Sequence, residues 1–345
     1  MKIVFVGPYS PPHGGIQVHL VQLVKFLEGQ GHLCYVIDLH KNMDGRSANI
    51  ASLRNAFEMP YYLIKKRDHK CHLHFGGNLH LRLLLLALFS GLLFHNRCAI
   101  TIHSGGLPVW GLPKNRMRRL FLRFSFSFCG ALICVNREIA GMFEDAGIKR
   151  ERIRVVPPFA FAIDHVREAL PDHINAFVTA KNPLFCNIGL LEPEYDLELL
   201  LRVFSSFVKH KPEAGLIMIG SGSLQSRLER RISDLGLSQR AMLTGDLLHS
   251  LTLNVLSSSD CYIRTSRYDG DCISLKEAIH LGVPAIATDT GIRPKEAILF
   301  SIGDEGGLLK RMMQVTNLQS KNTNISPGDD TSFLVEIERV LSCLF

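Results

Sequence analysis

Residues 261–289 read CYIRTSRYDGDCISLKEAIHLGVPAIATD, and this segment indicates the fold class. A short apolar run, CYIRTS, leads into an acidic loop that contains glycine, and a helix is predicted to begin near Ser274. Gly282 and Pro284 then turn the chain into a second apolar run, PAIATD. Because two parallel strands need a crossover connection, the segment predicts one strand–helix–strand unit of a parallel sheet.

The same alternation extends outward over most of the chain. Residues 1–160 alternate helical stretches with apolar runs such as KIVFVG, CYVID, CAITIH and ALICVN. The pattern stops after Pro157 and Pro158, so residues 161–182 are predicted as a linker, and it restarts over residues 183–330. Residues 331–345 contain a helix with one apolar face, expected to return to the N-terminal domain. We therefore predict an α/β protein with two doubly wound, Rossmann-like domains facing a cleft.

Composition limits the class of partner. The chain has 345 residues, of which 46% are hydrophobic and 21% charged, as in a well-packed enzyme. The net charge of +7 favours an anionic partner, but the charge is scattered, so no nucleic acid is expected. None of the 9 cysteines forms a C-x-x-C pair, which argues against a zinc or redox motif and favours a reducing cytoplasm.

Two segments are candidates for contact with a membrane. The apolar stretch 79–94 is shorter than the roughly 20 residues of a spanning helix, so a buried helix is expected there, and no signal peptide is recognised at the start. Residues 114–126, KNRMRRLFLRFSF, combine arginines with phenylalanines. We interpret them either as a peripheral contact with the inner face of an anionic membrane or as a solvated surface helix.

Three loops are candidates for ligand contact. Gly14 and Gly15 precede the first long helix, where paired glycines let the backbone approach a ligand. His103 stands at the carboxyl end of the predicted strand CAITIH, in a position to contact a sugar hydroxyl or to transfer a proton. In the third loop, Ser274 and Glu277 have the spacing of a capping box, and the alternative is a helix N-terminus aimed at a diphosphate.

These motifs together resemble the retaining glycosyltransferases of family four, which have the GT-B fold. That family shows E-x7-E followed by A-x-x-x-G-x-P-V-I-A-T, and Asp269, Glu277, Gly282 and Pro284 stand at matching positions. The opening GGIQVHLVQLVKFLEGQGH, the loop TIHSGG and the run IMIGSGSLQSRL are similar to family segments in the same order, over nearly the whole chain. The pattern DGD…SLKEA…RP resembles a subgroup found in surface-polysaccharide synthesis.

The resemblance implies a hexosyltransferase that uses a nucleotide-sugar donor, with UDP favoured, and a saccharide or lipid-linked acceptor that enters past Gly14, Gly15 and His103. The implied catalytic residues are His103, Asp269 and Glu277. The implied nucleotide-sugar-binding residues are Gly14, Gly15, Gly220, Gly222, Arg264, Asp271, Cys272, Ile273, Ser274, Glu277 and Arg293. No cofactor and no metal are expected: Asp269 and Asp271 form an acidic pair, but the resemblance is to the GT-B fold, and the Asp-x-Asp metal motif belongs to the other glycosyltransferase fold.

The chain departs from the family where the donor diphosphate is expected. The family has G-R-L-x-x-x-K-G, whereas Leu190 and Tyr195 stand here in place of its arginine and lysine. A diphosphate leaving group needs positive charge, so Arg264 and Arg293 are predicted as substitutes. The loss leaves a non-catalytic scaffold or regulatory protein open as an alternative. A nucleotide-sugar epimerase that shares the two-domain fold is a third candidate.

Overall fold

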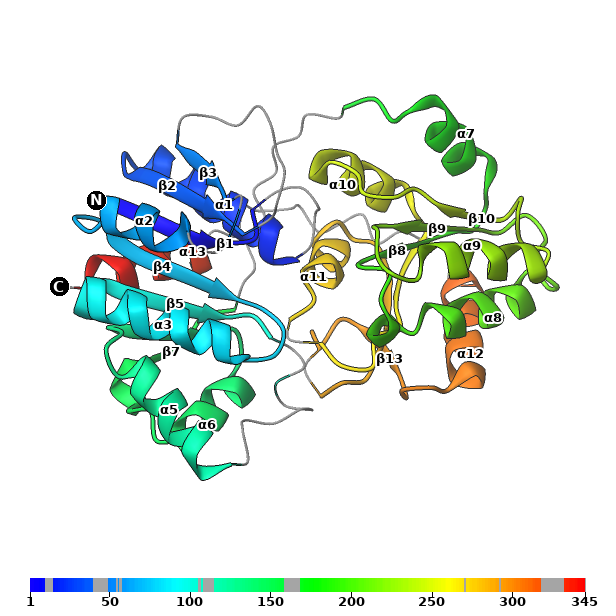
Figure 1. Ribbon diagram of the computed structural model, residues 1–345. Coiled ribbons are helices and arrows are strands. Elements are labelled where there is room, and N and C mark those ends of the chain that lie inside the picture. The colour runs from blue at the N-terminus through cyan, green and yellow to red at the C-terminus, as the bar shows by residue number, and fades with distance from the viewer. Residues whose placement is uncertain are drawn as a thin grey trace. The chain divides into compact units, whose positions relative to one another are not determined.

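The computed structural model describes residues 1–345 except 10–14, 40–48, 54, 56–57, 105–106, 108–114, 158–167, 270, 292, 318–331 and 345. The chain divides into two compact units, described separately below. The first domain comprises Met1–Ser10, Ile16–Ala162 and Asp330–Phe345, and the second comprises Pro11–Gly15 and Ile163–Asp329. Each contains one parallel sheet covered by helices on both faces (Figure 1), so the prediction of two doubly wound α/β domains is confirmed.

The sheet of the first domain has seven strands in the order β3-β2-β1-β4-β5-β6-β7. The strands are β1 Lys2–Gly7, β2 Leu33–Asp38, β3 Ile50–Ser52, β4 Lys70–Phe75, β5 Cys98–Ile102, β6 Ala131–Cys134 and β7 Ile153–Val155. All pairs are parallel, and the central strands are almost completely buried, which explains why their sequences are continuous apolar runs rather than alternating ones. The strand order reverses between β1 and β4, where such sheets bind ligands.

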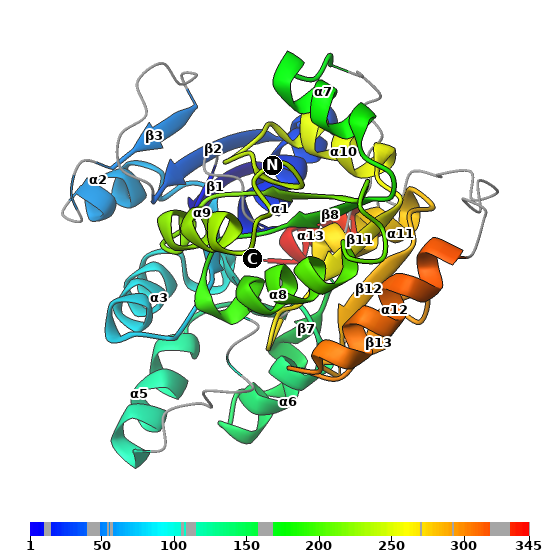
Figure 2. The same ribbon diagram turned by 90° about the vertical axis from the view of Figure 1, so that its right-hand side faces the viewer.

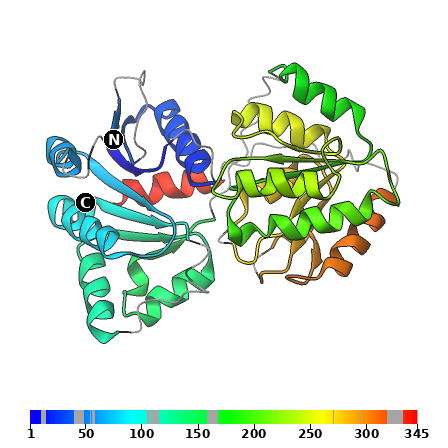
Figure 3. The same ribbon diagram turned by 45° about the vertical axis from the view of Figure 1, so that its right-hand side comes forward.

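Helices cover both faces of this sheet. The helices are α1 Gly15–Gly29, α2 Glu58–Lys65, α3 Leu81–Phe94, η1 His95–Arg97, α5 Arg116–Phe126, α6 Arg137–Asp145, η2 Arg150–Arg152 and α13 Ser332–Ser342. Helices α2, α3, α5 and α6 contribute to the core on one face, and α1 and α13 to the core on the other. The apolar face predicted for the last helix is buried, and α13 lies against the strands of the first domain (Figure 3). Its buried residues are Phe333, Leu334, Ile337, Val340 and Leu341.

The second domain has six parallel strands in the order β10-β9-β8-β11-β12-β13. The strands are β8 Leu184–Ile188, β9 Gly215–Ile219, β10 Ala241–Leu243, β11 Cys261–Arg264, β12 Ala285–Thr288 and β13 Ile298–Phe300. The helices are α7 Asp172–Ala180, η3 Pro193–Tyr195, α8 Leu197–Phe207, α9 Gln225–Asp234, α10 His249–Ser258, α11 Ile273–His280 and α12 Glu305–Asn317. Helices α8, α9 and α12 pack on one face (Figure 2), and α7, α10 and α11 on the other. The strand order reverses between β8 and β11.

Several local predictions were wrong. The predicted linker 161–182 contains helix α7, whose Ile174 is buried in the core of the second domain. Residues 50–52 form strand β3, which the apolar pattern of the sequence does not indicate and which pairs with β2. Helix α12 was not predicted, since two glycines and scattered polar residues weaken its helical pattern. The apolar helix α3 is only half buried, and its Leu81 is 63% exposed.

Two broader expectations can be compared with the structure. All nine cysteines are free thiols and eight of them are buried, as expected for small apolar side chains in the core. Among the described residues, no helix combines the length and the apolar character needed to cross a bilayer.

Candidate functional site

The polar residues of segment 261–289 lie at the carboxyl edge of the sheet of the second domain. Strand β11 ends at Arg264, the loop that follows contains Asp269 and Asp271, and α11 begins at Ile273. The N-cap of α11 is Cys272, whose side chain makes no capping hydrogen bond. The predicted capping box is therefore wrong: the hydroxyl of Ser274 pairs instead with the Tyr262 hydroxyl at 2.7 Å.

Arg264, Asp269 and Arg293 form a compact charged group. Nε and Nη2 of Arg264 contact Asp269 Oδ2 at 3.0 and 2.9 Å, and Nη1 of Arg293 donates to the same oxygen at 3.1 Å. The Ser266 hydroxyl is a further donor to Oδ2, at 3.0 Å. No described residue bonds to Oδ1 of Asp269, although the side chain is 13% exposed. One carboxylate oxygen is therefore fully used, and the other is left to accept a hydrogen bond.

The two arginines keep Asp269 ionised. Burial by itself raises the pKa of Asp269, but the adjacent guanidiniums of Arg264 and Arg293 outweigh burial and hold the pKa below its ordinary value. The side chains of Arg264 and Arg293 are only 6% and 1% exposed, so these cations are nearly enclosed by protein. Two guanidiniums and one carboxylate leave one excess positive charge in the group.

One of the two positions at which the chain departs from the family pattern lies beside this group. Tyr195, at the position of the family's lysine, lies under Arg264, whose guanidinium carbon is 4.4 Å from the ring centre. Nη1 of Arg264 also donates to the Ile188 carbonyl at 3.0 Å. Asp196, at the position of the family's following glycine, has φ 49°, the left-handed conformation that favours glycine. The guanidinium of Arg264 on β11 thus packs against Tyr195, the residue that replaces the family's lysine. Leu190, which replaces the family's arginine, carries no charge.

Glu277 lies in the second turn of α11 and is nearly buried, with a side chain 4% exposed. Its Oε1 pairs with Nε2 of His249, at the start of α10, at 2.7 Å. Among the described residues, Oε2 of Glu277 has no hydrogen-bond partner. Like Asp269, Glu277 thus has one oxygen fixed by a basic side chain and one oxygen available.

The remaining acidic residue of the loop is engaged differently. Asp271 forms an ion pair with Lys276 through a short contact with its Oδ2. Burial raises the pKa of Asp271, and the lysine offsets only part of this. Asp271 and Lys276 neutralise each other beside the Arg264 group.

The predicted nucleotide-side glycines have a structural reason for being glycine. A Cβ on Gly220, which has φ +134°, would lie 2.0 Å from the carbonyl oxygen of Gly189. A Cβ on Gly222 would lie 2.5 Å from the carbonyl oxygen of Leu191. The loop after β9 therefore packs directly on the loop after β8, and ligand contact is not needed to explain these residues.

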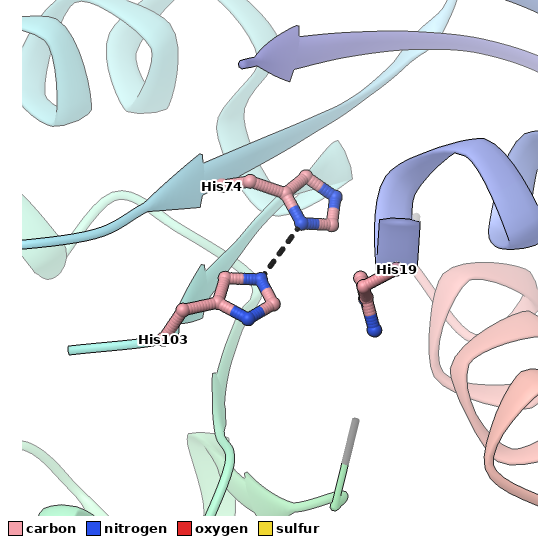
Figure 4. Close-up of side chains that lie close together, drawn as sticks. All are labelled: His19, His74 and His103. Atoms are coloured by element: carbon pink, nitrogen blue, oxygen red, sulfur yellow. Dashed lines mark hydrogen bonds between the residues drawn. The ribbon is translucent and has the colours of Figure 1, made fainter. Parts of the chain in front are cut away.

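In the first domain, His103 follows β5 and is half-buried. Its Nε2 is paired with Nδ1 of His74, which lies on β4, at 3.0 Å, and His19 on α1 faces both rings (Figure 4). Burial lowers the pKa of His19 to about 3. Burial and neighbouring histidines also hold the pKa of His74 and His103 well below the ordinary value, so these rings are neutral. Gly15 is described, whereas Gly14 lies outside the described residues.

The structure thus brings Arg264, Asp269 and Arg293 together, and Glu277 lies on the helix that follows the same loop. Sequence reasoning missed His249, Ser266, His19 and His74. The alternation in HLHF could have placed His72 and His74 on one face of a strand, but nothing in the sequence indicates that His19 lies beside them.

Two family models match the chain. The model described as "Glycosyltransferase Family 4" matches residues 13–160, and "Glycosyl transferases group 1" matches residues 172–304. An uncharacterised glycosyltransferase of Methanocaldococcus jannaschii is 30% identical over 33% of this chain and 28% of its own length. Mannosylfructose-phosphate synthase of Agrobacterium fabrum is 23% identical over 44% of this chain and 35% of its own length.

These matched segments therefore span about a third of either curated relative. Solved structures resemble the chain over its full length. The structure of Anabaena HepE in complex with UDP-glucose covers 99% of both chains with a TM-score of 0.76 and 16% identity, which shows a shared fold. With family models matching both domains in order, the chain belongs to the GT-B glycosyltransferases of family four.

Proposed function

We propose that the chain transfers a hexosyl group from a nucleotide-linked donor to a hydroxyl of a saccharide or lipid-linked acceptor, with retention of configuration, in surface-polysaccharide or glycan synthesis. One observation carries the proposal. Asp269 and Glu277, in the E-x7-E spacing, each have one oxygen fixed by a basic side chain and one oxygen with no partner among the described residues.

This arrangement suits recognition of hydroxyl groups. A carboxylate that is ionised and fixed in one rotamer accepts hydrogen bonds of the strong, charge-assisted kind. We assign Oδ1 of Asp269 to the hydroxyls of the donor sugar. Oε2 of Glu277 then accepts from the ribose of the nucleotide. UDP-glucose is a reasonable first donor to test, because Anabaena HepE, which has the same fold, binds it.

The leaving diphosphate requires positive charge. Transfer breaks the bond between the anomeric carbon and the diphosphate oxygen and forms a bond to the acceptor oxygen, and the acceptor's proton passes to the leaving diphosphate. Arg264 and Arg293 are too deeply buried to form direct ion pairs with phosphate oxygens. Their excess positive charge instead stabilises the leaving diphosphate from a distance, because the protein interior has a low dielectric constant and screens the charge less than water does. The amides at the start of α11 add favourable dipoles.

A thermal-shift screen with UDP-, GDP- and ADP-sugars tests donor binding. At a ligand concentration of 100 times Kd, binding stabilises the native state by about 2.7 kcal/mol, enough to raise Tm by several degrees. We expect one nucleotide to produce this shift and Glu277→Gln to abolish it. The control is Glu229→Gln, an exposed glutamate on α9, which should retain the shift.

Three outcomes are informative. The absence of a shift with every donor, in a folded protein, would contradict the proposal. Donor binding without transfer to any acceptor would favour the non-catalytic scaffold. Conversion of the nucleotide-sugar without an acceptor would favour the epimerase.

We also propose that α3 and α5 contact an anionic lipid surface that supplies a lipid-linked acceptor. The two helices pack side by side, in agreement with Figure 2. Both carry large apolar side chains that face solvent: Leu81, Leu85 and Leu92 on α3, and Met117, Leu120 and Phe124 on α5. The exposed Arg116, Arg118, Arg119 and Arg123 surround the α5 residues. Cations for lipid headgroups beside apolar side chains for the acyl boundary are typical of interfacial helices.

Flotation with liposomes tests this contact. We expect binding to vesicles that contain phosphatidylglycerol but little binding to pure phosphatidylcholine. Each arginine near an anionic surface contributes about 1 kcal/mol, so the double variant Arg118→Glu/Arg119→Glu should weaken binding at least 30-fold. The control with the same charge change, Lys209→Glu/Arg230→Glu, alters exposed residues of the second domain. Equal binding of the two variants would exclude α5 as the contact.

A further inference from the structure

Histidine rings from three elements of the first domain pack together. His72 and His74 lie two residues apart on β4, His19 comes from α1, and His103 follows β5 (Figure 4). The rings of His74 and His103 are stacked with centres 5.3 Å apart, and the ring of His19 lies edge-on to that of His103 with centres 4.8 Å apart. Only His103 was predicted as a site residue, so the presence of the other rings needs a physical explanation.

A hydrogen bond joins His103 to His74. Nε2 of His103 lies 3.0 Å from Nδ1 of His74, and the backbone N–H of His103 donates to the Phe75 carbonyl at 2.8 Å. Both rings are neutral, because burial and the neighbouring histidines lower the pKa of each well below the ordinary value. A neutral imidazole has one N–H and one bare nitrogen, so one of these rings donates to the other. The direction of this bond decides which nitrogen of His103 carries its proton.

The second ring nitrogen of His74 distinguishes the two directions. Nε2 of His74 is buried and has no hydrogen-bond partner within the part of the chain that the structure describes. If His103 donated, the proton of His74 would lie on Nε2, as a buried N–H without an acceptor. If His74 donates, Nε2 is a bare acceptor. Buried N–H groups without a partner are rarer in proteins than unsatisfied acceptors, so donation by His74 has the lower free-energy cost.

The neighbouring histidines support this direction. Nε2 of His72 lies 2.7 Å from the hydroxyl of Thr101, and its Nδ1 is buried with no partner among the described residues, so the same reasoning places its proton on Nε2. His19 lacks a described partner at both ring nitrogens and therefore buries one unsatisfied N–H in either tautomer. A second unsatisfied N–H on His74, whose ring centre is 5.5 Å from that of His19, would add to this cost.

The accessible nitrogen of His103 is then an N–H. Since Nε2 accepts from His74, the proton of the neutral His103 ring lies on Nδ1. This nitrogen points away from His74 (Figure 4), on a ring that is half-buried rather than enclosed. An N–H in this position donates to an oxygen atom of a ligand but has no lone pair with which to remove a proton.

We propose that His74 is a positioning residue that fixes His103 in the tautomer with its proton on Nδ1, so that His103 donates a hydrogen bond to a sugar hydroxyl oxygen and does not act as a general base. The identity of this ligand rests on the proposed function. The tautomer agrees with passage of the acceptor's proton to the leaving diphosphate, because no protein base is then required. Of the two roles that the sequence allows His103, the structure supports hydroxyl contact over proton transfer.

NMR of the full-length protein with ¹⁵N-labelled histidine shows which ring nitrogens carry a proton. We expect His103 to have a protonated Nδ1 and a bare Nε2, with its signals assigned by their loss in His103→Asn. His74→Leu removes the donor, so His103 should then populate the other tautomer, and kcat/KM for transfer should fall about 3- to 10-fold. His74→Asn places an amide N–H near the position of Nδ1 and should restore both the tautomer and most of the activity.

His72→Gln is the matched control. It changes a buried histidine of the same strand, and its amide nitrogen can keep the bond to Thr101. This variant should leave the tautomer of His103 unchanged and keep kcat/KM near the wild-type value. Circular dichroism establishes that each variant is folded, and the wild-type spectrum tests the proposal even if a variant does not fold.

The outcomes separate the tautomer from the proposed transfer. A bare Nδ1 on His103 in the wild-type protein would overturn the proposal. Equal losses of activity in His74→Leu and His74→Asn, with the tautomer of His103 unchanged in both, would also overturn it, because His74 would then act only through packing. A protonated Nδ1 in a protein that transfers no sugar would support the assignment of the proton and count against the proposed transfer alone.

Discussion

Replacing Arg264 by methionine should lower the free energy of unfolding by about 1.5–3 kcal/mol, because Asp269 loses a charged hydrogen-bond donor inside the protein and keeps only Arg293 as a cationic partner. Methionine keeps much of the length of the side chain but loses both contacts with Asp269. It also loses the hydrogen bond to the Ile188 carbonyl and the charge above the Tyr195 ring. Urea denaturation followed by circular dichroism measures the difference.

A neighbouring arginine provides the matched control. Arg267 pairs with Asp196 at 3.0 Å, but its side chain is 60% exposed. Solvent-exposed pairs contribute about 0–1 kcal/mol, so Arg267→Met should change stability by no more than that. Equal losses in the two variants would show that burial of Arg264 does not strengthen its pairing.

A double-mutant cycle separates the ion pair from the other contacts of Arg264. Asp269→Asn alone leaves two guanidiniums without their carboxylate, and the double variant Arg264→Met/Asp269→Asn removes one charge of each sign. We expect the double variant to lose less stability than the sum of the single losses, by about 0.5–3 kcal/mol. Additive losses would argue against direct coupling of the two side chains.

The fold could be predicted from the sequence because its strands are buried on both faces. Runs such as KIVFVG and GLIMIG have no polar alternation, which only a covered parallel sheet explains. Element ends were harder to predict. Strand β3 has three residues and depends on pairing with β2, and α7 is held by tertiary burial of Ile174 rather than by a strong helical pattern. Tertiary contacts decide such short elements, and local sequence carries little information about them.

The candidate site could be predicted only in part. Asp269 and Glu277 are close together in the sequence, so their spacing can be recognised without the structure. The partners of these carboxylates, Arg293 and His249, are separated from them by 24 and 28 residues and are brought close only by the fold. Arg264 and Arg293 were predicted to contact the diphosphate, whereas both bind Asp269, because a buried carboxylate attracts the nearest guanidiniums. Their action on the diphosphate stays a prediction.

The largest effect on activity is expected at Asp269. Oδ2 is occupied by Arg264, Arg293 and Ser266, which leaves Oδ1 to accept from a donor hydroxyl. Asparagine has nearly the same shape but no charge, and a hydrogen bond to a charged group contributes about 1.5–3 kcal/mol. Asp269→Asn should therefore lower kcat/KM for the nucleotide-sugar about 10- to 150-fold. Initial rates of transfer, at donor concentrations below KM, measure this.

Deoxy donors distinguish hydroxyl recognition from a general loss of structure. The wild-type enzyme should discriminate against the donor that lacks the hydroxyl bound by Asp269, because that oxygen is then left unpaired. In Asp269→Asn this preference should largely disappear, while the preference for the other hydroxyls remains. Asp196→Asn is the control, since Asp196 is also paired with an arginine, and asparagine tolerates its left-handed backbone conformation. If Asp269→Asn lowers the rates with all deoxy donors and the intact donor by the same factor, Asp269 acts through the stability of the loop and not through the sugar.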